Sequence, residues 1–112
     1  MTTSAEFRDL ALTLLEAESH PHRERESFRV RKKIFATLAE ADGIVVLKLE
    51  VEHQQQLVNS TPSTFMLVGW EKQGWTGLSL SKISHKDLQA LLITAWRNVA
   101  PAKLIKDFDN VK

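Results

Sequence analysis

The residues that this chain lacks exclude several kinds of chemistry. Its 112 residues include no cysteine, which excludes disulfide bridges, thiolate metal sites and a cysteine nucleophile. The four glycines are dispersed and form neither a GxGxxG fingerprint nor a phosphate-binding loop. No serine lies in a Gly-x-Ser-x-Gly elbow, and no carboxylate pair has the apolar setting that would shift a pKa. We therefore expect neither an enzymatic activity nor a bound cofactor.

Long apolar runs are missing as well. No stretch approaches the roughly 20 apolar residues that span a bilayer. The N-terminal sequence MTTSAEFRDL lacks the basic start and the apolar stretch of a signal peptide. The length is typical of one domain, which we expect to cover residues 1–112. The sequence predicts a cytoplasmic monomer that does not associate with a membrane.

Two histidines are close enough in sequence to raise the question of a metal site. His20 and His22 are separated only by Pro21 and have glutamates nearby. No further ligand spacing supports a site. The segment EAESHPHRERES, which contains all three residues, reads instead as a solvated loop. We expect no bound metal.

Helix signals mark both ends of the chain. Thr3 and Glu6 have the spacing of a capping box, and an apolar stripe follows at Phe7, Leu10, Ala11 and Leu14. Ser84 and Asp87 begin a second stripe that ends before Pro101. A short helix is predicted in VEHQQQLVN, and one or two helical turns are predicted around residues 104–108. The apolar stripe of the second long helix includes Trp96, which we assign to the core.

Alternating segments predict the strands. They cover residues 28–31, 33–39, 44–50, 65–69 and 75–80, with Asp42-Gly43 and Gly74 at two of the turns. Short connections between consecutive strands favour antiparallel pairing. The apolar helical stripes need a sheet face to cover. The sequence therefore predicts a two-layer α+β domain, with an antiparallel sheet of about five strands and helices on one face.

Strict alternation sorts the strand residues into two faces. One face is apolar throughout and consists of Phe28, Val30, Ile34, Ala36, Leu38, Val45, Leu47, Leu49, Leu78 and Leu80. The other carries four cations, two aromatic rings and one carboxylate, in the set Arg29, Arg31, Lys33, Phe35, Thr37, Ile44, Val46, Lys48, Glu50, Trp75, Gly77 and Ser79. A β-bulge near Trp75 would move that ring to the apolar face.

The basic face has two interpretations. Long basic side chains keep the open face of an antiparallel sheet solvated and cover Phe35 and Trp75 with their apolar stems. Alternatively, cations that neutralise phosphates and aromatic rings that stack on bases form a nucleic-acid platform. The net charge is only +1, so the second interpretation depends on local clustering. The cluster lies in residues 23–33, where two glutamates interrupt it, and comprises Arg23, Arg25, Arg29, Arg31, Lys32 and Lys33.

A resemblance to a known family favours the nucleic-acid interpretation. The runs FRVRKKIFATL, VLKLE, GWTGLSL and AWRNVAPAKL resemble the MmcQ/YjbR family of small bacterial proteins. The family pattern matches Phe28, Arg29, Val30, Lys33, Ile34, Phe35, Ala36, Lys48, Gly74, Trp75, Ala95 and Trp96. The first hairpin turn departs from it, with Arg31-Lys32 where the family often has glycines. The resemblance implies a CyaY-like fold, the frataxin architecture, and DNA binding through a "double wing" motif.

Two functions follow as hypotheses. In the first, the basic face and the first hairpin bind DNA, chiefly through backbone phosphates. Charge neutralisation is assigned to Arg29, Arg31, Lys32, Lys33 and Lys48, and stacking or packing to Phe35 and Trp75. In the second, the same face binds a protein or a small ligand without catalysis, with Phe35 and Trp75 as anchors.

Overall fold

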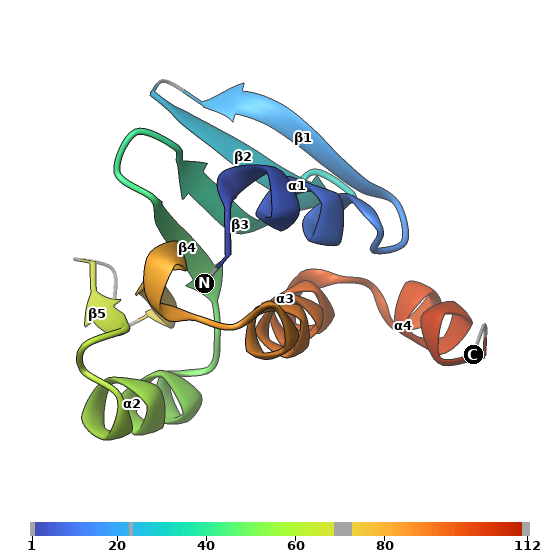
Figure 1. The fold of residues 1–112 in the computed structure, drawn as a ribbon. Helices are drawn as coiled ribbons and strands as arrows, with labels where there is room; N and C mark the ends of the chain where they lie inside the picture. The colour runs from blue at the N-terminus through green and yellow to red at the C-terminus, as the bar shows by residue number, and fades with distance from the viewer. Residues whose placement is uncertain (1, 23, 69–72, 111–112) are drawn as a thin grey trace.

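A single antiparallel sheet organises the chain. The computed structural model describes residues 2–22, 24–68 and 73–110 (Figure 1). In these ranges, six strands are hydrogen-bonded in the order β1-β2-β3-β4-β6-β5, and all neighbours are antiparallel. The elements in chain order are α1 (Ser4–Leu12), β1 (Ala17–His22), β2 (Arg25–Val30), β3 (Lys33–Ala39), β4 (Ile44–Lys48), α2 (Val51–Ser60), β5 (Phe65–Leu67), β6 (Trp75–Ser79), the short 3-10 helix η2 (Leu80–Lys82), α3 (His85–Val99) and α4 (Ala102–Asn110).

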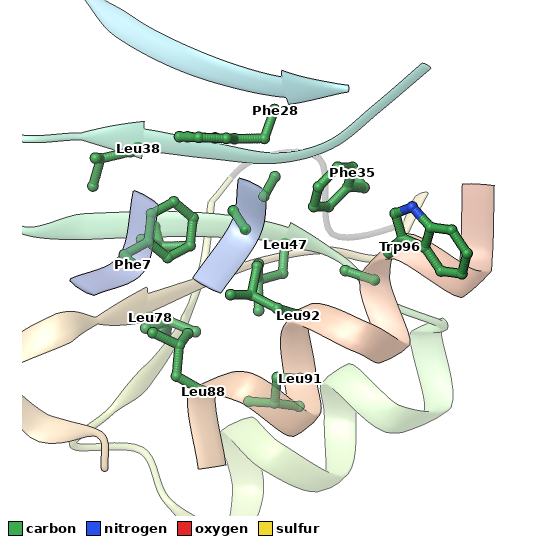
Figure 2. Packing of buried hydrophobic residues seen from close by; sticks show 14 of the residues in the cluster. Phe7, Phe28, Phe35, Leu38, Leu47, Leu78, Leu88, Leu91, Leu92 and Trp96 are labelled. Carbon is green, nitrogen blue, oxygen red and sulfur yellow. The ribbon is translucent and has the colours of Figure 1, made fainter. Parts of the chain in front are cut away.

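The core lies between one face of the sheet and the helices α1 and α3. The rings of Phe7 in α1 and Phe28 in β2 meet edge to face, with their centroids 5.2 Å apart. Leu88 and Leu92 of α3 are buried in the same cluster, against the apolar side chains of β3 and β4 (Figure 2). The predicted two-layer α+β architecture is therefore confirmed. Trp96 is fully buried, as the apolar stripe of α3 predicted.

The segment that was predicted to be a loop contains a strand. β1 pairs with β2 along its whole length, from Ala17 opposite Val30 to His22 opposite Arg25. The loop prediction rested on Pro21 and on the polar composition, and it was wrong because β1 is an edge strand. An edge strand tolerates a proline, since only one of its sides needs to donate hydrogen bonds to the sheet. Among the described residues, the sheet consequently has six strands rather than about five.

The predicted helix starts are confirmed by their capping contacts. In α1, the Thr3 hydroxyl accepts a hydrogen bond from the Glu6 amide at 3.2 Å, and the Glu6 carboxylate accepts one from the Thr3 amide at 2.9 Å. In α3, the Ser84 hydroxyl accepts from the Asp87 amide at 3.1 Å. These bonds satisfy backbone donors that have no partner inside the helix. α4 is longer than the predicted one or two turns, and its Phe108 packs against Trp96.

The capping box of α1 makes the stability of this helix depend on pH. Hydrogen bonds from the Thr3 backbone and side chain lower the pKa of Glu6 below its ordinary value of 4.5. A carboxylate whose pKa is lower in the folded state than in the unfolded state stabilises the folded state. This contribution is complete above the unfolded pKa and is lost as the pH falls through the folded pKa. We expect α1 to fray below about pH 4.5 in the wild type. Glu6→Gln should weaken this dependence, which amide hydrogen exchange of α1 at pH 3–6 would measure. An identical pH profile in both proteins would contradict the assignment.

Two glycines provide the turn conformations expected of them. Gly43 and Gly74 have φ angles of 65° and 88°, a region that side chains disfavour. β5 ends at Leu67, and Gly69, the predicted end of that strand, lies outside the described residues. Within the described ranges, no helix has the length and apolarity needed to cross a bilayer.

Candidate nucleic-acid interface

The β2–β3 hairpin carries the densest positive charge of the predicted site. β2 ends at Val30 and β3 begins at Lys33, so that Arg31 and Lys32 form a two-residue turn. Their φ angles are 51° and 71°, the left-handed pair that a type I′ turn requires and that Asn-Gly usually provides. Two long cationic side chains therefore extend from the tightest point of the hairpin, and both residues are exposed.

A β-bulge next to this turn changes the face of Phe35. Phe28 pairs with Ala36, whereas Arg29 pairs with Ile34, so Phe35 is the extra residue, without a partner on β2. A bulge shifts side-chain alternation by one residue. Phe35 is fully buried in the core, and Figure 2 shows it among the side chains that fill the space between the sheet and α3. Its predicted position on the basic face was wrong, and half-buried Ile34 takes its place.

Three of the predicted residues do share the open face. Arg29 lies between the core residues Phe28 and Val30 and therefore points to the opposite side. Lys48 pairs with Trp75 across β4 and β6, and the Lys48 ammonium lies 5.3 Å from the centre of the Trp75 ring. This distance is typical of a cation–π contact. Because Trp75 is half-buried and on the open face, the alternative in which a bulge moves it into the core does not occur.

The backbone around Trp75 is held from two elements. The Gln54 side chain of α2 donates a hydrogen bond to the Trp75 carbonyl at 2.9 Å, and the Leu49 amide donates to the Gly74 carbonyl at 3.0 Å. A Cβ atom on Gly74 would lie 1.7 Å from the Leu49 carbonyl oxygen, so only glycine permits this approach. Trp75 is therefore presented by a fixed backbone rather than by a free loop.

The five predicted cations differ in how far their charges are already engaged. Arg31 is paired with Glu16, and Lys48 donates to the Gln73 carbonyl as well as lying over Trp75. Arg29 donates from Nε to the Ser27 hydroxyl at 3.1 Å. Lys32 and Lys33 are exposed, and among the residues that the structure describes neither makes an ion pair. The available charge is thus concentrated at the hairpin tip.

Lys33 reaches this tip from an unexpected side. It pairs with Val30, and directly paired residues point to the same face of a sheet. Val30 is buried under the helices. The Lys33 side chain therefore points to the helix-covered side at the end of the sheet, whereas Arg29 points to the open face. The bulge at Phe35 again explains the difference, because it separates Lys33 from the alternation of the rest of β3.

The centre of the open face is made of small or apolar side chains. One continuous row of paired residues crosses the sheet here, running through His20, Ser27, Thr37, Val46, Gly77 and Met66. Ser27 is fully buried and donates to the His20 carbonyl at 3.0 Å. The Thr37 hydroxyl is buried without a hydrogen-bond partner among the described residues. Arg29, Lys48 and Trp75 each lie two residues along their strands from a member of this row, and therefore on the same face.

The structure adds one residue that the sequence had not pointed to. The carboxylate of Glu16, in the connection between α1 and β1, accepts two hydrogen bonds from Arg31. No local signal links residues that lie so far apart in sequence, because their proximity depends on β1, which was predicted to be a loop.

The predicted histidine pair contributes no ligand cluster in the described part of the chain. His20 Nε2 lies 3.2 Å from a Glu18 carboxylate oxygen on the same strand, and the side chain of His22 lies outside the described residues. Within these ranges no group of three or more histidine, aspartate or glutamate residues could hold a metal ion. Arg23 of the basic cluster is also outside them.

Comparisons with known proteins agree with the fold. In the crystal structure of Deinococcus radiodurans protein DR2400, a domain of the DUF419 family, the matching region covers 88% of this chain and 79% of that one. The TM-score is 0.78 and the sequence identity is 19%, so the likeness concerns the fold. None of the curated proteins matches the chain. The family model of YjbR matches residues 12–98, a region that contains the sheet, the basic hairpin and Trp75. The chain belongs to the YjbR family.

Proposed function

We propose that this protein binds nucleic acid in the cytoplasm, chiefly through backbone phosphates, with the tip of the β2–β3 hairpin as its principal contact. The observation that carries the proposal is the run of three cations at residues 31–33, two of them on left-handed turn positions. Lys32 and Lys33 are exposed and unpaired within the described residues. An arginine and a lysine at left-handed turn positions cost backbone free energy, because residues with a side chain disfavour these φ angles. Phosphate neutralisation would give that charge a function.

The open face adds a secondary contact in this proposal. Arg29 lies on the strand that leads to the tip, and Trp75 offers a half-buried ring beside Lys48. An aromatic ring of this kind stacks on a base without strong sequence preference. Phe35 has no part in it, because its ring is in the core.

We expect reversal of the two unpaired tip charges to reduce binding strongly. Lys32→Glu/Lys33→Glu should weaken binding of a labelled duplex and of a labelled single strand by roughly tenfold or more at low salt. The slope of log affinity against log salt should become shallower by about two, since two phosphate contacts are lost. Fluorescence anisotropy at several salt concentrations would measure both quantities.

The matched control is Lys82→Glu/Lys86→Glu. These two lysines are also exposed but lie on η2 and at the start of α3, so the variant has the same net charge. It should bind nearly as well as the wild type. Equal losses in both variants would mean that only net charge matters, and negligible binding by the wild type would refute the proposal.

The alternative function, a binding adaptor on the same face, now depends on Trp75 alone because its second anchor is buried. Under that alternative, Trp75→Ala should abolish partner binding while the tip variant binds normally and salt has little effect. The two functions therefore predict opposite outcomes for the same pair of variants.

A further inference from the structure

The Arg31 guanidinium at the hairpin tip is occupied by a carboxylate from another part of the chain. Arg31 Nε lies 2.6 Å from Glu16 Oε1, and Nη2 lies 3.1 Å from Oε2. This is the parallel two-bond arrangement in which arginine recognises planar anions. Both side chains are about half exposed, at 55% for Arg31 and 47% for Glu16, so solvent and larger molecules can reach the pair.

Both partners are turn residues with backbone angles in the left-handed region. Glu16 has a φ angle of 54° and Arg31 one of 51°, and residues other than glycine seldom adopt such angles outside turns and strained sites. The ion pair between them is exposed, and exposed ion pairs contribute little to stability. Residues in sparsely populated backbone regions cluster at ligand-binding and switch sites. The pair between these two residues therefore contributes little to stability and lies where the backbone is typical of ligand-binding sites.

Carboxylate and phosphate are interchangeable ligands for the Arg31 guanidinium, whose paired N–H donors we call the Arg31 fork. The guanidinium presents fixed N–H donors that match two oxygens of either anion. Hydrogen bonds from Arg31, and more weakly the nearby charge of Lys103 on α4, keep the pKa of Glu16 below its ordinary value. Glu16 is therefore fully ionised at neutral pH and neutralises Arg31 beside the two unpaired lysines.

We propose that the Arg31 fork is a phosphate subsite that Glu16 occupies in the free protein, and that a phosphodiester group of bound nucleic acid displaces Glu16. The inference rests on the proposed function and specifies it, since it names one phosphate position and the internal anion that competes for it. Glu16 then lowers the affinity for nucleic acid without contacting it in the complex.

Removing the competing carboxylate tests the inference. Glu16→Gln keeps the size of the side chain and should bind a labelled duplex roughly two- to fivefold more tightly than the wild type at low salt, as expected from the strength of an exposed ion pair. In an Arg31→Gln background the same substitution should give no gain beyond its effect on net charge. Glu52→Gln, an exposed carboxylate on α2, measures that net-charge effect.

The outcomes separate this inference from the proposed function. Tighter binding by Glu16→Gln that disappears without Arg31 supports the subsite. A gain no larger than that of Glu52→Gln, or one that persists without Arg31, overturns it while the tip lysines can still bind nucleic acid.

A second measurement keeps the subsite testable if no variant binds an oligonucleotide, an outcome that would refute the proposed function. Pyrophosphate can be titrated while the Arg31 Nε–H resonance is followed by NMR. The resonance should shift at lower pyrophosphate concentration in Glu16→Gln than in the wild type. Equal titration curves would overturn the subsite.

Discussion

Phe35→Ala is expected to lower the free energy of unfolding by about 3–5 kcal/mol, the usual cost of removing a buried phenylalanine ring. The adjacent substitution Ile34→Ala should cost only about 1 kcal/mol, because Ile34 is half-buried on the open face. The difference arises from the bulge, which sends Phe35 into the core and leaves Ile34 outside it. Urea denaturation followed by circular dichroism would measure both values.

Strict alternation along β3 predicts the reverse order, with Ile34 as the costlier position. A larger loss for Ile34→Ala would therefore contradict the bulge. Phe35→Leu provides a milder variant if the alanine protein does not fold, since it keeps most of the buried volume and should cost about 1–2 kcal/mol. The open-face interpretation of Phe35 predicts almost no effect for that substitution.

Trp96→Ala is expected to be about as destabilising, at roughly 3–5 kcal/mol. The indole is fully buried in α3 and packs against Phe108 of α4, with 5.1 Å between the ring centroids. Its Nε1 also donates a hydrogen bond to the Leu15 carbonyl at 3.0 Å. One side chain thereby connects α3 with α4 and with the α1–β1 connection.

Trp96→Phe separates the two contributions of the indole. It retains most of the apolar contact but leaves the Leu15 carbonyl without its donor, for a cost of about 1–3 kcal/mol. Chemical denaturation would give both losses, and hydrogen exchange of the α4 amides would report whether that helix loosens. If Trp96→Ala proved nearly neutral, the indole would not be a core residue at all.

Features that depend on near neighbours in sequence could be predicted. The Thr3–Glu6 and Ser84–Asp87 caps, and the turns at Gly43 and Gly74, are each specified within a few residues. β1 could not be predicted in the same way. Its composition is polar, it contains Pro21, and its strand conformation comes from pairing with β2 at the edge of the sheet.

The candidate site was predictable where strand pairing is regular. Lys48 and Trp75 lie opposite each other because β4 and β6 pair without interruption. Strict alternation predicted the wrong face for Lys33 and Phe35. The segment FRVRKKIFATL alternates without interruption, and nothing in its amino-acid sequence marks the extra residue of a bulge. The contact between Glu16 and Arg31 could not be predicted, because it depends on tertiary structure alone.

The left-handed turn at Arg31-Lys32 also limits which substitutions these two positions accept without a loss of charge. An Asn-Gly pair would close the same hairpin with less backbone strain, and it would remove two cations from the tip in the same step. Relief of backbone strain and positive charge at the tip therefore oppose each other at these two positions. A relative with glycines here would have a hairpin that is easier to close and a tip that attracts anions less strongly.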